Sequence, residues 1–498
     1  MRLNTLLLLA LLPSTWLSAE VTLPAILSSH MVVQRDRPVH VWGMASPGEE
    51  VTVSFRGQTR AVKAGELGRF SVYLSPGAAG GPFQMKVQGA RADGTAQVIT
   101  LDDILVGDLW LASGQSNMEF ELRKAATGEA DIPHAGNDRI RLLKVKKHTA
   151  ESPQDDVESE GWKASTPDSA ASFSAVGWYF AREIAQREQA PVGVIDATWG
   201  GTVAESWVRL TALGEDASLM PLFVSRGRME EREADAVLEV QREEKLIAAA
   251  KAAGQPAPEY PWHAPLPTWA PGWIYNGMIA PLTPMAIRGV IWYQGESNSA
   301  VERAPLYHRI FRTLIEDWRR QWGEGDFPFL YVQIANFKSG SGEDWATLRE
   351  EQRKTLELRN TAMAVTIDIG NPENVHPTNK LEVGLRLARA ARALSYGEVI
   401  EYSGPLYRQS VPEGNAMRVW FDHAQGLRVQ GDALTGFEVA GSDGRFLPAT
   451  AKIEGETVVV ASPEVAEPVA VRYGWANSPL CNLYNGEGLP ASPFRTGK

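Results

Sequence analysis

Between residues 104 and 397 the chain alternates two patterns, and this alternation leaves few folds open to it. Short apolar runs occur at 104–112, 192–197, 289–294, 328–335 and 361–367. Helical periodicity lies between them, most clearly where large apolar side chains recur every four residues: Leu306, Ile310, Leu314, Trp318 and Trp322. A second helix is expected over about 380–393. Strands that alternate with helices form a largely parallel sheet covered by helices on both faces, so the pattern predicts an α/β domain over residues 103–397.

Strand-and-turn patterning flanks this region on both sides. Alternating runs at 51–55 and 69–74, separated by Gly and Pro clusters, predict a β-sandwich module over residues 20–102. Similar runs at 417–421, 457–461 and 469–473 predict a C-terminal β-rich module over residues 398–498. A chain of 498 residues exceeds what one hydrophobic core supports, which agrees with several domains.

An insertion at about 211–271 interrupts the α/β pattern. Its charge-dense middle, residues 226–253, predicts a solvated helix, and its end is rich in Pro and Trp. A rigid surface loop is the simplest interpretation. Loops this long are uncommon unless they have a function, and indole faces stack well on sugar rings. We therefore expect this segment to form a wall of the substrate site.

Composition excludes several classes of protein. A hydrophobic content of 44% with 22% charged residues is typical of folded globular proteins. The formal charge of −11 provides no basic surface, so neither nucleic acid nor an anionic membrane is an expected partner. The chain has one cysteine, so no intrachain disulfide can form, and Cys481 is expected to be a packed residue. Its histidines and carboxylates show no metal-ligand spacing, so we expect no catalytic metal and no cofactor.

The N-terminus has the features of a secretory signal peptide. Arg2 is followed by an apolar core from Leu6 to Leu12 and then by Leu17-Ser18-Ala19. One positive charge, a short apolar core and a small-residue cleavage site define such leaders, and this core is too short to anchor the chain in a bilayer. Residues 1–19 are expected to be removed, with the mature protein periplasmic or secreted and without a membrane anchor.

The first candidate catalytic residue is Ser116, which follows the apolar run 104–112 in a small polar turn, Gly114-Gln115-Ser116-Asn117. A serine at the C-terminal end of a strand presents its hydroxyl at the sheet edge, and its backbone N–H can bind an oxyanion. A helix N-cap is the commoner role of such a serine. This segment alone leaves both interpretations open.

Two further strands end in turns that could complete an oxyanion hole. The run 192–197 leads into Trp199-Gly200-Gly201, where glycine lets a backbone N–H approach a ligand closely. The run 289–294 leads into Gln294-Gly295-Glu296-Ser297-Asn298, whose asparagine could offer a side-chain N–H and whose Gln294 and Glu296 could position loops or substrate. Ordinary turns explain both segments equally well. Glu296 could also be a glycosidase carboxylate, but no partner acid has a persuasive spacing.

His376 lies after the strand-like run 361–367 and just before a predicted helix. A histidine in that loop can reach the Ser116 hydroxyl and accept its proton. The other seven histidines are interpreted as ordinary surface or core residues.

These segments together resemble the sialate O-acetylesterase family, carbohydrate esterases of the SGNH (GDSL-like) hydrolase superfamily. The resemblance rests on the turn at 114–118, the Gly200-Gly201-Thr202 and 204–207 segments, residues 292–298, His376-Pro377 with Asn379-Lys380, and a C-terminal segment at 475–495. It implies an SGNH-hydrolase-like parallel sheet sandwiched by helices, flanked by N- and C-terminal β-rich modules.

The resemblance also implies a role for each site residue. Ser116 would be the nucleophile, His376 the general base, and the Ser116 N–H, Gly201 N–H and Asn298 side chain the oxyanion hole. The superfamily often has an aspartate three residues before the histidine, where this chain has Glu373. We expect Glu373 to orient His376, with Asp368 or no acid at all as alternatives. Substrate binding or loop positioning is expected of four further residues: Gln115, Gln294, Glu296 and Trp199.

The sequence thus predicts a serine esterase that removes O-acetyl groups from glycans such as sialic acid, xylan or xyloglucan. Two alternatives belong to other classes. One is a carbohydrate-binding protein on an inactive scaffold, favoured by the missing aspartate. The other is a retaining glycosidase that uses Glu296.

Overall fold

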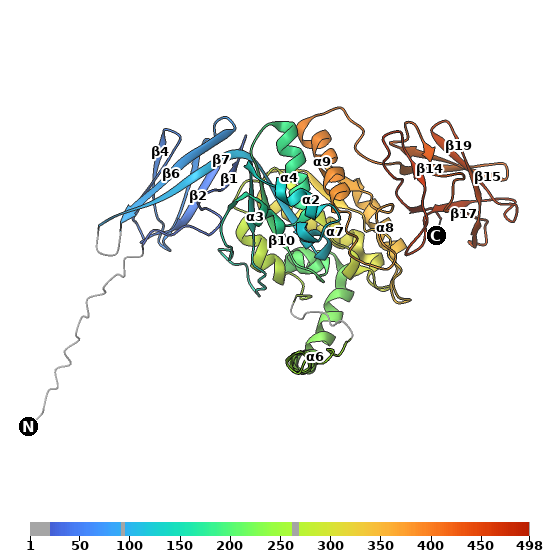
Figure 1. Cartoon of the computed structure of the whole chain (residues 1–498), viewed down its shortest axis with the longest axis horizontal. Coiled ribbons are helices and arrows are strands. Elements are labelled where there is room, and N and C mark those ends of the chain that lie inside the picture. The colour runs from blue at the N-terminus through green and yellow to red at the C-terminus, as the bar shows by residue number, and fades with distance from the viewer. Residues whose placement is uncertain (1–19, 91–94, 261–267, 498) are drawn as a thin grey trace, which may run out of the picture.

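The computed structural model describes residues 20–90, 95–260 and 268–497, and the expected leader at 1–19 lies outside them. Three parts follow one another along the long axis of the molecule: a β-rich part, a central α/β part and a second β-rich part (Figure 1). The predicted fold class is confirmed.

The N-terminal part consists of short strands and the start of one very long strand, and all but one of the strand pairings described here are antiparallel. Its elements are β1 (Val32–Gln34), β2 (Val39–Met44), β3 (Glu50–Phe55), β4 (Gln58–Lys63), β5 (Arg69–Leu74) and β6 (Gly80–Ala90). Strand β7 (Ala96–Gly114) pairs with β6 over its first half and enters the central sheet with its second half. One uninterrupted strand therefore runs across the predicted boundary at residues 102 and 103.

The central sheet has the strand order β13-β12-β11-β7-β10-β8-β9. Its other members are β8 (Asn137–Lys144), β9 (Lys163–Ser165), β10 (Val192–Thr198), β11 (Gly289–Tyr293), β12 (Phe329–Val332) and β13 (Thr361–Ala364). All neighbours pair in parallel except β9, which is antiparallel at the edge. Strands β7, β10 and β11 therefore end at the same edge, and each end leads into a predicted site segment.

Helices cover both faces of the sheet, as expected. On one face, Phe180 of α4 (Ala175–Glu188) packs on Trp110 of β7 with ring centroids 4.9 Å apart, and α9 (Lys380–Tyr396) lies beside α4. On the other face, Trp318 of α7 (Tyr307–Trp322) packs on Trp292 of β11 at 5.8 Å. Both helices predicted from periodicity are present, and α8 (Trp345–Lys354) packs against α7.

The insertion contains α5 (Leu210–Gly214) and the long helix α6 (Met220–Ala252), which projects from the body of the molecule (Figure 1). Part of its Pro- and Trp-rich end, residues 261–267, lies outside the described residues. Among the helices of the described chain, none combines the length and the hydrophobicity needed to cross a bilayer.

The C-terminal part has its own apolar core and two four-stranded sheets. Their strands are β14 (Leu406–Glu413), β15 (Ala416–Asp422), β20 (Thr457–Ala461) and β19 (Thr450–Glu454), then β18 (Phe446–Pro448), β17 (Phe437–Ala440), β21 (Ala470–Tyr473) and β23 (Phe494–Arg495). Arg349 of α8 joins this part to the centre, because its buried guanidinium donates to the carbonyls of Ala476 and Asn477 at 2.8 Å each. Burial raises the pKa of the Cys481 thiol to about 12, so this thiol stays protonated.

Candidate active site

Ser116 lies where β7 ends at the edge of the central sheet. Gly114 has a φ of +130°, and a Cβ there would lie 2.2 Å from the carbonyl oxygen of Tyr293, so only glycine fits at this crossing. The short helix α1 (Ser116–Glu119) follows at once. Gln115, not Ser116, occupies the N-cap position, and no side chain caps the helix. The Ser116 hydroxyl is therefore not used as a helix cap.

The Ser116 hydroxyl meets an imidazole from the far end of the domain. His376 Nε2 lies 2.7 Å from Ser116 Oγ, although the two residues are 260 positions apart. Burial lowers the pKa of His376, and the positive charge of Lys380 lowers it further, while Glu119 opposes the shift. The ring is thus neutral near pH 7 and able to accept a proton from the hydroxyl.

Neither acid expected beside His376 contacts it. The Glu373 side chain is 74% exposed and pairs with Lys338 Nζ at 2.7 Å. The Asp368 carboxylate forms two hydrogen bonds of 2.7 Å with Arg386. Within the described part of the chain, His376 forms no side-chain hydrogen bond other than the one with Ser116. The structure brings Ser116 and His376 together, but it does not bring Glu373 to them.

The Gly200-Gly201 turn passes directly beside Ser116. A Cβ on Gly200 would lie 3.2 Å from Ser116 Cβ, and the Gly200 N–H donates to Glu119 Oε2 at 2.6 Å. Gly201 has a φ of +75°, and its carbonyl accepts from Trp269 Nε1 of the insertion at 2.8 Å. Among the described residues, neither the Ser116 N–H nor the Gly201 N–H finds an acceptor. Two backbone donors thus remain available beside the hydroxyl.

Asn298 and Gln294 form a buried layer beneath this turn. Asn298 Oδ1 accepts from Ala204 N at 2.9 Å and from Gln294 Nε2 at 2.7 Å. Its Nδ2 donates to Glu205 Oε2 at 2.9 Å, and the whole side chain is buried. These bonds connect the loop after β10 to the loop after β11. The role of Asn298 as an oxyanion donor stays a prediction.

The Gln115 side chain also connects two loops, because it binds the backbone of the loop after β11. Its Oε1 accepts from the backbone N–H groups of Gly295 and Ser297 at 3.3 and 3.2 Å. Trp199 is half-buried, and Lys147 Nζ lies 5.9 Å from the centre of its ring.

Beneath the Ser116–His376 pair lies a buried polar network that the sequence analysis missed. Asn117 Nδ2 donates to Glu296 Oε1 at 2.5 Å and to the Val375 carbonyl at 3.0 Å, and Asn117 Oδ1 accepts from Lys380 Nζ at 2.5 Å. One amide therefore connects the nucleophile segment to the residue before His376. No spacing in the sequence indicates this contact, since Asn117 and Lys380 are 263 positions apart.

The charges in this network are strongly perturbed. Burial raises the pKa of Glu296 and lowers the pKa of Lys380 to about 7, while the attraction between the two groups opposes both shifts. Glu296 Oε2 is buried without a hydrogen-bond partner. A carboxyl so enclosed is not presented to a sugar, which disfavours the glycosidase alternative. Within the described residues, no group of three His, Cys, Asp or Glu side chains could hold a metal ion.

Comparisons with known proteins relate the chain to carbohydrate esterases. The family model of "carbohydrate esterase, sialic acid-specific acetylesterase" matches residues 263–393. Human sialate O-acetylesterase is 30% identical, with 94% of this chain and 91% of the human protein covered, and the mouse enzyme is 28% identical over similar shares of 94% and 93%. A carbohydrate acetylesterase from Xanthomonas citri is similar in structure, with a TM-score of 0.83, 40% identity, and coverage of 96% of this chain and 100% of that one.

The fold, the site and these relatives define a carbohydrate O-acetylesterase, a hydrolase of acetyl esters on sugars. The chain belongs to the sialate O-acetylesterase family.

Proposed function

We propose that this esterase removes acetyl groups from glycans through a covalent acetyl-Ser116 intermediate. The observation that carries the proposal is the 2.7 Å contact between Ser116 Oγ and His376 Nε2 at the half-exposed sheet edge. A neutral imidazole at hydrogen-bond distance from a hydroxyl is the arrangement that activates a serine nucleophile.

In the first step, His376 Nε2 takes the proton of Ser116 Oγ as the oxygen bonds to the acetyl carbonyl carbon. The tetrahedral oxyanion is held by the Ser116 and Gly201 N–H groups, with Asn298 as the expected third donor. Each such donor contributes about 2.7–4 kcal/mol. The bond from carbon to the sugar oxygen then breaks, and His376 gives its proton to the leaving alcohol. Water, deprotonated by His376, then attacks the acetyl carbon of acetyl-Ser116. The bond from this carbon to Ser116 Oγ breaks, Ser116 Oγ takes back the proton from His376, and acetate is released.

Positioning of the pair falls to the Asn117 network in place of a triad acid. Asn117 bonds to the carbonyl of Val375, the neighbour of His376, and is itself the neighbour of Ser116. Its partners Glu296 and Lys380 are buried and hold the amide from both ends. The histidine loop therefore keeps its place without contact from Glu373.

The test replaces the two residues separately and measures acetate release from p-nitrophenyl acetate. Ser116→Ala and His376→Ala should each abolish nearly all activity, because one removes the nucleophile and the other its base. His134→Ala, which changes an exposed histidine, is the control and should retain activity. Retention of most activity by Ser116→Ala would contradict the proposal.

The proposed substrates are acetylated sialic acid and acetylated plant polysaccharides such as xylan and xyloglucan.

We further propose export of the protein, with residues 1–19 removed. N-terminal sequencing of the exported protein should then begin at Glu20, and a sequence beginning at Met1 would contradict this.

A further inference from the structure

The Asn298 amide has all but one of its hydrogen-bonding positions in use. A carboxamide has two acceptor positions and two N–H donors. Both acceptor positions of Oδ1 are occupied, by the Ala204 N–H at 2.9 Å and by Gln294 Nε2 at 2.7 Å. One N–H of Nδ2 donates to Glu205 Oε2 at 2.9 Å, and the second has no acceptor within the described residues. These bonds fix the plane of the amide and the direction of its one remaining donor.

Asn298 lies on a loop that contacts the nucleophile segment on both sides of Ser116. The two residues that precede Asn298 bind the two chain neighbours of Ser116. These contacts are Asn117 Nδ2 to Glu296 Oε1 at 2.5 Å and the Ser297 N–H to Gln115 Oε1 at 3.2 Å. A fixed N–H without an acceptor in this place suits an oxygen that gains negative charge only during the reaction.

A buried ion pair holds the amide in this orientation. The Glu205 side chain is buried, and its two oxygens have different partners: Oε2 accepts from Asn298, and Oε1 accepts from Nη2 of Arg303. The Arg303 side chain is only 12% exposed. A buried carboxylate requires such a cation, and a charged acceptor holds an N–H more firmly than a neutral one. The orientation of Asn298 therefore depends on both members of the pair.

Arg303 also connects the pair to the Gly201 turn. Its guanidinium lies over the ring of Trp269, 5.0 Å from the ring centroid, where a cation and an indole attract each other. Trp269 belongs to the insertion, and its Nε1 donates to the Gly201 carbonyl at 2.8 Å. One guanidinium thus contacts the groups that hold Asn298 and the groups that hold Gly201.

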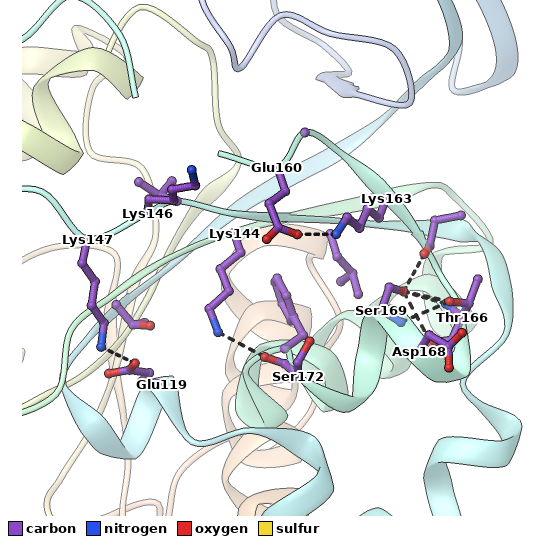
Figure 2. A pocket seen from close by; sticks show the side chains of 16 residues that line it. Glu119, Lys144, Lys146, Lys147, Glu160, Lys163, Thr166, Asp168, Ser169 and Ser172 are labelled. Atoms are coloured by element: carbon purple, nitrogen blue, oxygen red, sulfur yellow. Dashed lines mark hydrogen bonds and ion pairs between the residues drawn. The ribbon is translucent and has the colours of Figure 1, made fainter. Parts of the chain in front are cut away.

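Glu119 holds the same turn at its other end. Its Oε2 accepts from the Gly200 N–H at 2.6 Å, and its Oε1 lies 2.5 Å from Lys147 Nζ, as Figure 2 shows. Gly200 in turn lies against Ser116, because a Cβ added to it would be 3.2 Å from Ser116 Cβ. The Gly201 N–H lies between the Gly200 N–H and the Gly201 carbonyl along the chain, so bonds on both sides fix its direction.

We propose that the Glu205–Arg303 ion pair positions two donors of the oxyanion hole. Glu205 orients the Asn298 amide so that its remaining N–H faces the reacting carbonyl, and Arg303 keeps Trp269 against the Gly201 carbonyl. Both members of the pair act through other groups, so they are positioning residues. The inference rests on the proposed serine mechanism and gives the insertion a part in catalysis.

The test is a double-mutant cycle on the full chain, with kcat and KM measured for p-nitrophenyl acetate. Asn298→Ala should lower kcat about a hundredfold, since it removes one donor to the oxyanion. Glu205→Gln offers one oxygen to two donors and should lower kcat about tenfold with little change in KM, because the oxyanion forms only after the substrate has bound. In the Asn298→Ala background, Glu205→Gln should cause no further loss of kcat, because the amide that it orients is gone.

Two Arg303 variants test the pair independently and decide the matter if Glu205→Gln does not fold. Arg303→Met leaves the Glu205 carboxylate buried without a cation, so that a proton neutralises it, and kcat should fall about tenfold. Arg303→Lys keeps a cation beside the carboxylate and should hold kcat within about threefold of the wild-type value.

Glu350→Gln is the matched control. Glu350 is also buried and pairs with an arginine, Arg353, at 2.6 Å. Its substitution therefore removes a comparable ion pair from α8 and should leave kcat at the wild-type value.

Three results would overturn the inference. One is a Glu205→Gln variant with the wild-type kcat. Another is a double variant in which the losses caused by Glu205→Gln and Asn298→Ala multiply, since the two residues would then act independently. The third is an Arg303→Lys variant as slow as Arg303→Met. Each can occur while Ser116→Ala still abolishes hydrolysis of p-nitrophenyl acetate, so failure of the ion pair is distinguishable from failure of the serine mechanism.

Discussion

Replacing Lys380 with Met should change how the stability of the catalytic domain depends on pH. Lys380 is 1% exposed, and burial lowers its pKa from 10.5 to about 7. The pKa of the folded state is thus below that of the unfolded chain. Between about pH 7 and 10.5 the unfolded chain binds more protons, so stability rises with pH across this window.

The size of the effect follows from the two pKa values. One pKa unit corresponds to about 1.4 kcal/mol. From pH 7 to pH 9 the unfolded lysine stays protonated, while the folded one goes from half to almost fully deprotonated. The free energy of unfolding of the wild-type protein should therefore increase by about 2 kcal/mol over this interval, and the Lys380→Met variant should lack this increase. In the variant, Glu296, whose pKa is already raised by burial, would lose the positive charge of Lys380 beside it. This loss would widen the difference in pH dependence between the wild-type protein and the variant.

Urea unfolding followed by tryptophan fluorescence measures this quantity. The signal comes largely from the centre of the molecule, which contains fully buried indoles: Trp110, Trp178, Trp207, Trp292 and Trp318. Lys338→Met is the matched control, because Lys338 is 68% exposed, and it should keep the pH dependence of the wild-type protein. Equal increases in the wild-type protein and Lys380→Met between pH 7 and 9 would refute the reasoning, since Lys380 would then titrate normally.

Two further substitutions test the local geometry of the site. Glu373→Gln should keep kcat/KM for p-nitrophenyl acetate within about twofold, since Glu373 contacts Lys338 rather than His376; a hundredfold loss would show that it orients the imidazole after all. Gly200→Ala should lower kcat about tenfold, because its Cβ would lie 3.2 Å from both Ser116 Cβ and Glu119 Oε2. Gly214→Ala is the control, since a Cβ there meets nothing within 4 Å, and equal activity of the two variants would count against close approach of the turn.

The arrangement of strands and site loops could be predicted because it depends on local patterns. Each apolar run that became β7, β10, β11 or β13 precedes a polar or glycine-rich turn, and parallel strands bring such turns to one edge. The period of four in α7 was equally visible. The length of β7 could not be predicted, because the same alternation of residues is compatible with two separate strands or with one strand shared by two sheets.

The contacts of individual side chains could not be read from spacing. Glu373 lies three residues before His376, but the Glu373 N–H bonds to Asn371 Oδ1 and the His376 N–H to Asn374 Oδ1, each at 2.9 Å. These two hydrogen bonds close local turns, and the Glu373 carboxylate points outward from them. The contact of Asn117 with Lys380 joins residues 263 positions apart, and it exists only because α1 and α9 begin next to each other.

Covalent labelling tests the serine mechanism most directly. The full chain is treated with a fluorophosphonate, digested, and the modified peptide is identified by mass spectrometry. We predict one adduct, on Ser116, that forms rapidly in the wild-type protein and is nearly lost in His376→Ala, because the imidazole activates the hydroxyl. An unlabelled Ser116, or labelling that proceeds equally well without His376, would contradict the account and favour a glycan-binding protein on an inactive esterase scaffold.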